Sequence, residues 1–324
     1  MRIVFLGTPD FAVPSLEALV DAGHEVGAVV TQPDRPKGRH RRPVAPPVKL
    51  AAAAHGLPVL QAENVNAPDV FGRLRSLAPD FVVTAAFGQK LGADLLALAR
   101  CECLNVHASL LPRHRGAAPV AYAILEGDPE TGVTLMRMAK RMDAGEVFAQ
   151  AATPIGHHET TGELSGRLAV LGAGLLVRSL DAIAGGALVP VRQDPGRVTL
   201  APSLRKADAA MPWDKAADTL TRFVRAMSPW PAAFTFWLPQ DGPPVRLAVH
   251  QAEALAGPAG QPGRIASANA DGIDVQTGSG LLRIARLQRQ GKRPMDAADF
   301  LHGNPLAPGH LLGPAPPAHS ERRP

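Results

Sequence analysis

The sequence predicts an α/β fold in which a Rossmann-like, mostly parallel sheet is followed by a small, OB-like β-barrel. Residues 1–150 alternate short apolar runs with helical patterns, which is typical of β-α-β units. Residues 213–313 instead contain short β-rich runs separated by Gly and Pro turns, which favours a small barrel. The length of 324 residues fits about two domains of roughly 150 residues each.

The first half of the chain contains the expected parallel sheet and its helices. The apolar run Ile3–Leu6 is predicted to be the first buried strand. Pro14 then begins a helix, because proline at a helix start lacks only an N–H that has no helical partner. The remaining elements expected in this half are strands at Val26–Thr31, Phe81–Thr84, Leu104–His107 and Gly132–Met136, a helix at Val48–Ala54 and a long helix over 159–185.

The second half divides at a stretch rich in proline, glycine and charge. Residues 188–208 contain Pro190, Pro195, Gly196 and Pro202, which predicts a linker. Barrel strands are expected at Phe234–Trp237, Val245–Val249, Gly272–Val275 and Leu281–Leu287. The predicted organisation is therefore a domain at 1–189, a linker at 190–208, a barrel domain at 209–313 and a disordered tail at 314–324.

Composition restricts the class of protein. No apolar run approaches the ~20 residues needed to span a bilayer, and the N-terminal run lacks the pattern of a signal peptide. The two cysteines form no C-x-x-C, so we expect no zinc or other metal site and a reduced, cytoplasmic compartment. The net charge of +5 and pI near 9.6 weakly favour an anionic partner.

Asn105 and His107 are candidate catalytic residues at the end of a predicted strand. Strand alternation places them on one face, and ligands bind at the carboxyl ends of strands in such sheets. An amide donor beside an imidazole suits a developing oxyanion, and a histidine can exchange protons near neutral pH. The alternative is a histidine that caps the strand end through backbone hydrogen bonds.

Asp143 is a candidate catalytic carboxylate in the turn Met142-Asp143-Ala144-Gly145. A carboxylate next to glycine is usually a solvated turn residue. Opposite a histidine at a strand end, however, it could orient the imidazole and accept a proton from an amine. Spacing alone does not show whether Asp143 and His107 meet.

Two basic clusters favour a polyanionic partner. The first lies at residues 35–42, contains no acidic residue and consists of Arg35, Lys37, Arg39, Arg41 and Arg42. A clamp on nucleic-acid phosphates and a solvated loop are both compatible with it. The second lies on the predicted barrel and consists of Arg283, Arg286, Arg289, Lys292 and Arg293. It is compatible with a nucleic-acid-binding face or with ordinary surface charge.

The motifs taken together resemble those of the methionyl-tRNA formyltransferases along nearly the whole chain. In the first half the matching motifs are Gly7-Thr8-Pro9-Asp10-Phe11-Ala12, Thr31-Gln32-Pro33-Asp34-Arg35-Pro36, the run from Asn105 to Pro119, Gly132-Val133-Thr134 and Asp143-Ala144-Gly145. In the second half they are Pro229-Trp230-Pro231 and Gly291-Lys292-Arg293. The Ser109-Leu110-Leu111-Pro112 stretch resembles that of enzymes that use 10-formyltetrahydrofolate.

The resemblance implies a formyltransferase catalytic domain, a tRNA-binding barrel and a set of site residues. The implied substrates are 10-formyltetrahydrofolate and methionyl initiator tRNA, with no metal and a monomeric enzyme. The implied catalytic residues are Asn105, His107 and Asp143. The implied folate-binding residues are Phe87, Gly88, Ser109, Leu110, Leu111 and Pro112. The implied tRNA-binding residues are Arg35, Lys37, Arg39, Arg41, Arg42, Lys292 and Arg293.

Three departures from the family pattern and two alternative functions stay open. Ala139-Lys140-Arg141 replaces commonly acidic positions, Glu146 replaces an aspartate, and Met211-Pro212-Trp213 replaces Ile-Asp-Trp. The same folate chemistry could act on a sugar-nucleotide or another small amine, although such an acceptor needs no extended basic track. An inactive transferase fold that only binds is the second alternative, and the intact catalytic residues argue against it.

Overall fold

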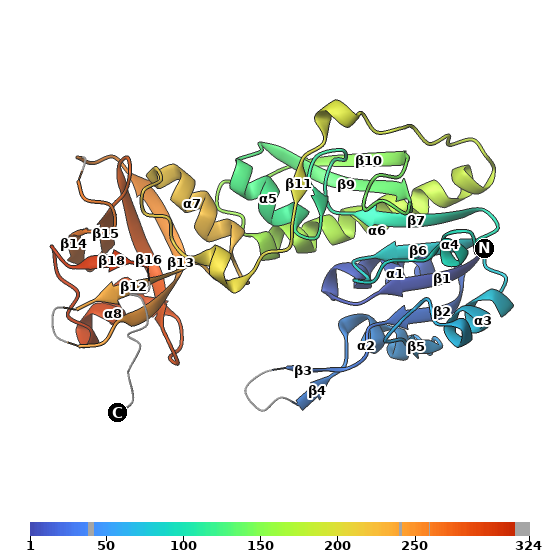
Figure 1. The fold of residues 1–324 in the computed structure, drawn as a ribbon, viewed down its shortest axis with the longest axis horizontal. Coiled ribbons are helices and arrows are strands. Elements are labelled where there is room, and N and C mark those ends of the chain that lie inside the picture. Colours follow the sequence, from blue (N-terminus) through green and yellow to red (C-terminus); the bar gives the residue numbers. More distant parts are fainter. Residues whose placement is uncertain (38–41, 240–241, 259, 315–324) are drawn as a thin grey trace, which may run out of the picture. The chain divides into compact units, whose positions relative to one another are not determined.

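The computed structural model describes residues 1–37, 42–239, 242–258 and 260–314, so the predicted tail lies outside it except for Pro314. The chain forms two compact units (Figure 1). Unit 1 comprises Met1–Ala123, Pro129–Ile155 and Glu163–Pro202. Unit 2 comprises Ile124–Asp128, Gly156–Gly162 and the chain from Ser203 onward. The domain limits expected from the sequence stay a prediction.

Unit 1 contains a seven-stranded sheet in the order β10-β9-β7-β6-β1-β2-β5. Its five neighbouring strands β7, β6, β1, β2 and β5 are parallel, whereas β9 pairs antiparallel with β7 on one side and with β10 on the other. The mostly parallel α/β sheet is therefore confirmed. The strands are β1 (Arg2–Gly7), β2 (Glu25–Thr31), β5 (Val59–Gln61), β6 (Phe81–Ala85), β7 (Glu102–His107), β9 (Glu130–Arg137) and β10 (Val147–Pro154).

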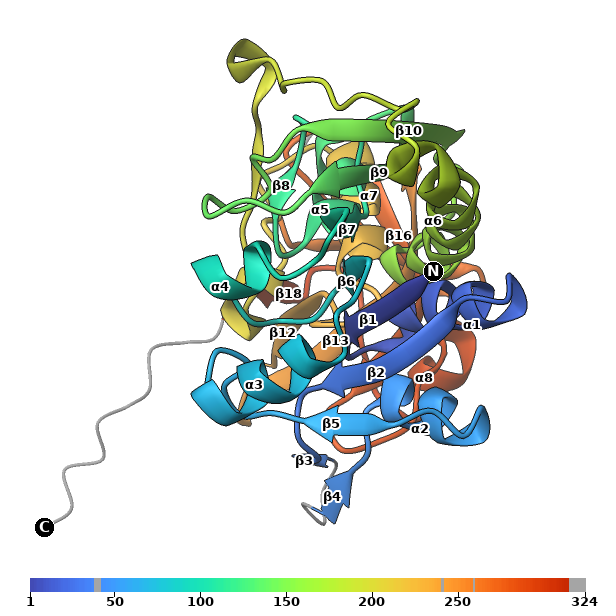
Figure 2. The same cartoon turned by 90° about the vertical axis from the view of Figure 1, so that its right-hand side faces the viewer.

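Helices cover both faces of this sheet (Figure 2). On one face, buried side chains of β1 and β2 pack with Leu74 of α3 and Leu95 of α4. On the other face, α6 approaches so closely that a Cβ on its Gly172 would lie 2.7 Å from Val106 of β7. The helices are α1 (Val13–Asp21), α2 (Pro47–Ala54), α3 (Pro68–Ser76), α4 (Ala93–Leu96), α5 (Pro119–Glu126) and α6 (Thr161–Ala184).

Unit 2 is a curled antiparallel sheet in the order β14-β15-β16-β13-β12-β18, with β17 beside β16. The N–H of Ile265 donates to the carbonyl of His310, and the N–H of Leu312 donates to the carbonyl of Gly263. These hydrogen bonds bring β18, at one end of the strand order, against the region of β14 at the other end, which confirms the predicted small barrel. Its elements are α7 (Ala217–Ala226), β12 (Phe234–Leu238), β13 (Val245–Leu255), β14 (Ile265–Asn269), β15 (Gly272–Gln276), β16 (Leu281–Arg289), β17 (Met295–Asp296), α8 (Ala297–Gly303) and β18 (Leu311–Gly313).

Among the described residues, four short strands lie outside the two large sheets. The hairpin β3 (Arg35–Lys37) and β4 (Arg42–Val44) follows β2, within the predicted basic loop. The pair β8 (Arg115–Gly116) and β11 (Leu200–Ala201) joins the segment after β7 to the segment expected to be a linker.

Candidate active site

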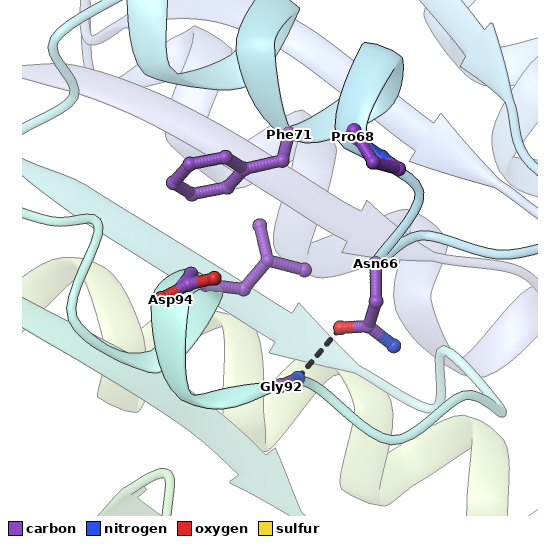
Figure 3. A pocket seen from close by; sticks show the side chains of 6 residues that line it. Asn66, Pro68, Phe71, Gly92 and Asp94 are labelled. Atoms are coloured by element: carbon purple, nitrogen blue, oxygen red, sulfur yellow. Dashed lines mark hydrogen bonds between the residues drawn. The ribbon is translucent and has the colours of Figure 1, made fainter.

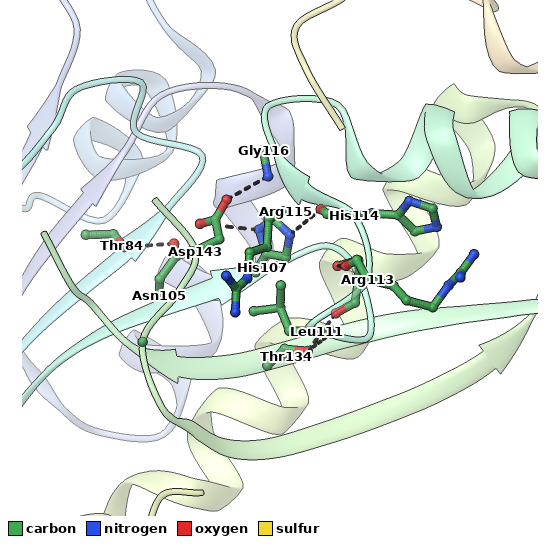
Figure 4. Close-up of polar contacts among 12 residues, drawn as sticks. Thr84, Asn105, His107, Leu111, Arg113, His114, Arg115, Gly116, Thr134 and Asp143 are labelled. Carbon is green, nitrogen blue, oxygen red and sulfur yellow. Dashed lines mark hydrogen bonds and ion pairs between the residues drawn. The ribbon is translucent and has the colours of Figure 1, made fainter. Parts of the chain in front are cut away.

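Asn105 and His107 lie at the carboxyl end of β7, where β6 and β9 flank the strand (Figure 4). Asn105 pairs in register with Thr84 of β6, and His107 pairs with Thr134 of β9. Two residues apart on a strand, both side chains point to the same face of the sheet. The structure therefore places them together, as the sequence predicts.

The amide of Asn105 is held by Thr84, a residue that the sequence analysis missed. The Thr84 hydroxyl lies 2.8 Å from Asn105 Oδ1 and 3.0 Å from the carbonyl oxygen of Leu104. With Oδ1 accepting from Thr84, the two amide N–H groups are the part of Asn105 turned away from β6. These N–H groups can then donate to an incoming oxygen.

The imidazole of His107 is buried and contacts a polar group at each nitrogen. Nε2 lies 3.0 Å from the carbonyl oxygen of His114, and Nδ1 lies 3.8 Å from Oδ1 of Asp143. A carbonyl oxygen can only accept, so Nε2 carries the proton and Nδ1 of the neutral ring carries a lone pair. Burial lowers the pKa of His107, while the Asp143 carboxylate and the bond to His114 partly oppose this shift. The ring is therefore neutral near pH 7.

Asp143 reaches His107 from the turn between β9 and β10. Its Oδ2 accepts a hydrogen bond of 2.9 Å from the backbone N–H of Gly116, and its backbone is left-handed with φ of +47°. Gly145 closes the turn, and a Cβ there would collide with the carbonyl oxygen of Arg137. The turn thus needs glycine for steric reasons, and it brings the carboxylate to the histidine.

The loop Ser109–Pro112 after β7 is fixed by side chains from β9 and β10. Thr134 Oγ1 donates to the carbonyl of Ser109 at 2.6 Å and accepts from the N–H of Leu111 at 3.1 Å. Gln150 Nε2 donates to the carbonyl of Leu111 at 2.9 Å. Ser109 and Leu111 are buried, so their side chains shape the loop from within, whereas Leu110 and Pro112 are partly exposed.

Phe87 and Gly88 follow β6 and therefore lie at the same edge of the sheet as Asn105 and His107. Phe87 is buried in the core, and its carbonyl oxygen accepts a bond of 3.1 Å from Thr8 Oγ1. Gly88 has φ of +86°, which a residue with a side chain rarely adopts. The predicted folate-binding residues are thus brought beside the predicted catalytic residues.

The basic hairpin leaves the same carboxyl edge, after β2. Arg35 Nη2 lies 2.6 Å from Oε2 of Glu63, and Arg42 is exposed. At the base of the hairpin, Lys49 Nζ and Gln61 Nε2 both donate to the carboxylate of Asp34, and these two bonds lower the pKa of Asp34. Lys37 is described only by its backbone, in β3, and Arg39 and Arg41 lie outside the described residues.

The barrel cluster is partly neutralised by acidic neighbours, which the sequence did not reveal. Arg283 donates to both carboxylate oxygens of Asp274, at 2.7 and 3.0 Å, and Arg286 lies 3.7 Å from Asp296. Lys292 and Arg293 are exposed in the turn between β16 and β17. The two predicted basic clusters belong to different units of the chain.

A pocket lies between α3 and α4 (Figure 3). Its lining consists of Asn66, Pro68, Phe71, Gly92, Asp94 and Leu95 and includes none of the predicted site residues. Within the described ranges, no three His, Cys, Asp or Glu side chains gather where they could share a metal ion. In the same part of the chain, no helix is both long and apolar enough to cross a membrane.

Comparisons with known proteins agree over both units. Residues 1–180 match the family described as formyl transferase, and residues 203–305 match the formyl transferase C-terminal domain. A methionyl-tRNA formyltransferase of Citrifermentans bemidjiense is 47% identical over 97% of this chain and 96% of its own length. One from Moorella thermoacetica is 44% identical over 97% of this chain and 99% of its own.

Solved structures with a similar fold are more distant in sequence. HypX from Aquifex aeolicus has a TM-score of 0.63 at 18% identity over 94% of this chain and 48% of its own. An N-formyltransferase from Helicobacter canadensis has a TM-score of 0.62 at 15% identity over 89% of this chain and 99% of its own. At these identities the likeness concerns the fold alone.

Proposed function

The chain belongs to the methionyl-tRNA formyltransferase family, and on that premise we propose that it transfers the formyl group of 10-formyltetrahydrofolate to the α-amino group of methionyl initiator tRNA. The products are N-formylmethionyl-tRNA, which serves translation initiation, and tetrahydrofolate. The single observation that carries the proposal is that the side chains of Asn105, His107 and Asp143 lie close together at one edge of the sheet. We place the enzyme in the cytoplasm, as a monomer that needs no metal.

Asn105 acts on the oxyanion of the reaction. The α-amino nitrogen attacks the formyl carbon, a C–N bond forms, and the carbonyl electron pair moves to oxygen. The N–H groups of Asn105, oriented by Thr84, donate to that oxygen. Donors fixed before the reaction stabilise developing charge without having to reorganise.

His107 and Asp143 act on the proton that the amine loses. The lone pair of His107 Nδ1 faces Oδ1 of Asp143 at 3.8 Å. Both atoms can accept a proton, so a proton between them can be bound by either. The released proton is held between them, and protonated His107 adds a positive charge near the oxyanion. When the intermediate collapses, the bond from carbon to N10 of the folate breaks, its electron pair stays on N10, and N10 receives this proton.

The two substrates meet at the carboxyl edge of the sheet. Folate binds beside Phe87 and Gly88 and the Ser109–Pro112 loop, whose backbone is fixed by Thr134 and Gln150. Acceptor-arm phosphates bind the basic cluster that follows β2 and the turn between β16 and β17. The residues are Arg35, Lys37, Arg39, Arg41 and Arg42 in the cluster, and Lys292 and Arg293 in the turn. Placing the amine and the formyl carbon side by side supplies much of the rate.

The decisive experiment measures transfer of labelled formyl from 10-formyltetrahydrofolate to three acceptors. These are methionyl initiator tRNA, methionyl elongator tRNA and a uridine-diphosphate amino sugar. Transfer to the initiator alone is expected, and transfer to the sugar alone would show a small-amine enzyme instead. The same assay on His107→Ala tests the mechanism, because unchanged activity in this variant would contradict a role for His107.

A further inference from the structure

The 191–201 segment, expected from the sequence to be part of a linker, lies against both chain segments that contact His107. Val191 exchanges two backbone hydrogen bonds of 2.8 Å with Val147, just after the Asp143 turn. At its other end, Leu200 and Ala201 pair with Arg115 and Gly116 as parallel strands. The segment therefore joins the turn that carries Asp143 to the loop that carries the carbonyl of His114.

Gln193 makes the central contacts of the 191–201 segment. Its Nε2 donates to the carbonyl oxygen of Asp143 at 2.9 Å and to that of Gly145 at 2.7 Å. Its Oε1 accepts from Nε and Nη2 of Arg115 at 3.0 and 2.7 Å. A carboxamide has two N–H donors and two acceptor lone pairs, so this side chain is fully used.

The hydrogen bonds from Gln193 stabilise a turn whose backbone conformation is unfavourable for most residues. Asp143 has a left-handed backbone, a conformation that is unfavourable for a residue with a Cβ, although aspartate tolerates it better than most. Gln193 binds the carbonyls at both ends of the Asp143–Gly145 turn. Without it, two partly buried carbonyl oxygens and the guanidinium of Arg115 would lose these partners.

Thr199 acts on the opposite side of His107. Its Oγ1 accepts from the N–H of His114 at 2.8 Å, and its carbonyl accepts from the N–H of Arg115 at 2.9 Å. The carbonyl of His114 is the partner of His107 Nε2. One segment thus supports the partners of both imidazole nitrogens.

We propose that Gln193 is a positioning residue for formyl transfer, which sets the carboxylate of Asp143 against Nδ1 of His107. The inference rests on the proposed function, since it assumes that Asp143 and His107 carry the reaction. Gln193 itself contacts the backbone of the turn and Arg115, and it acts on the chemistry through Asp143.

The test compares Gln193→Met with the matched control Gln251→Met, which makes the same change at an exposed glutamine of β13. For Gln193→Met we expect kcat to fall roughly 10- to 100-fold, the size typical of lost orienting contacts, with both KM values changed less than about twofold. The acid limb of the kcat profile should move to lower pH, because a displaced carboxylate no longer supports protonation of His107. The control should match the wild type.

Two outcomes would overturn the inference while leaving the proposed function intact. One is a Gln193→Met enzyme with a lower Tm but an unchanged kcat and pH profile at temperatures where it is folded. The other is a fully active Gln193→Glu enzyme, because glutamate can still accept from Arg115 but, when ionised, cannot donate to the two carbonyls. This second variant decides the question if Gln193→Met does not fold. Failure of the wild type to formylate methionyl-tRNA would instead refute the proposed function.

Discussion

Nδ1 of His107 and Oδ1 of Asp143 face each other at 3.8 Å, while Nε2 of the same ring lies 3.0 Å from the carbonyl of His114. The carbonyl fixes the tautomer and leaves the lone pair of Nδ1 toward the carboxylate. The distance is too long for a direct hydrogen bond, and a neutral imidazole with its lone pair toward a carboxylate has no proton to share with it. The pair is thereby prepared to take up one proton, which formyl transfer to an amine releases.

Removing the charge of Asp143 should affect both rate and titration. For Asp143→Asn we expect kcat to fall about 10²- to 10⁴-fold, the usual contribution of a positioned proton acceptor. The pKa of His107 should fall further, because the carboxylate is the main group that raises it against burial. Formyl-transfer kinetics and the NMR titration of the His107 ring measure the two effects. Asp299→Asn, at an exposed position of α8, is the control for loss of one carboxylate.

Thr84→Val should reduce catalysis without removing a catalytic residue. The valine keeps the shape of the buried side chain but cannot donate to Asn105 Oδ1. A hydrogen bond contributes about 0.5–1.5 kcal/mol net, which corresponds to roughly a 2- to 13-fold lower kcat. Thr235→Val in β12 removes the acceptor of Trp213 Nε1 and should lower the Tm but not kcat. An unaltered kcat in Thr84→Val would contradict the orientation of Asn105.

The salt dependence of tRNA binding should show whether the basic cluster at residues 35–42 contacts tRNA phosphates. The double variant Arg41→Ala with Arg42→Ala should bind methionyl-tRNA more weakly, with the affinity for folate nearly unchanged. Loss of two phosphate contacts should reduce the slope of log K against log salt by about 1.4 to 1.8. Arg100→Ala is the control, because Arg100 pairs with Asp80 at the opposite edge of the sheet. An equal loss of folate affinity would be evidence against the assignment.

Acid should destabilise the protein through His107. Its pKa is lowered from 6.5 by burial, so below pH 6.5 the unfolded chain binds a proton that the folded chain does not. The free energy of unfolding then falls as pH falls from 6.5 to the folded pKa, with a contribution of at most about 1.4 kcal/mol per pH unit. Urea unfolding at several pH values measures this slope. His107→Gln should show a shallower slope, and equal slopes would disprove the argument.

The sequence predicted the regular elements because their signals are local. The apolar run Ile3–Leu6 became β1, and the 159–185 pattern became α6 (Thr161–Ala184). The three-residue strand β5 was missed because so short a run shows no periodicity. Thr84, Gln150 and Gln193 were missed for another reason: single polar residues carry no pattern, and only their contacts show what they orient.

The sequence by itself determined that Asn105 and His107 share a face, because strand geometry alternates side chains regardless of what surrounds the strand. Only the tertiary structure decided that Asp143 faces His107, that Asp274 neutralises Arg283, and that the 191–201 segment supports the active site. The physical reason is that these contacts join residues far apart in the chain. Their geometry depends on how strands and turns pack, which the local spacing of residues does not specify.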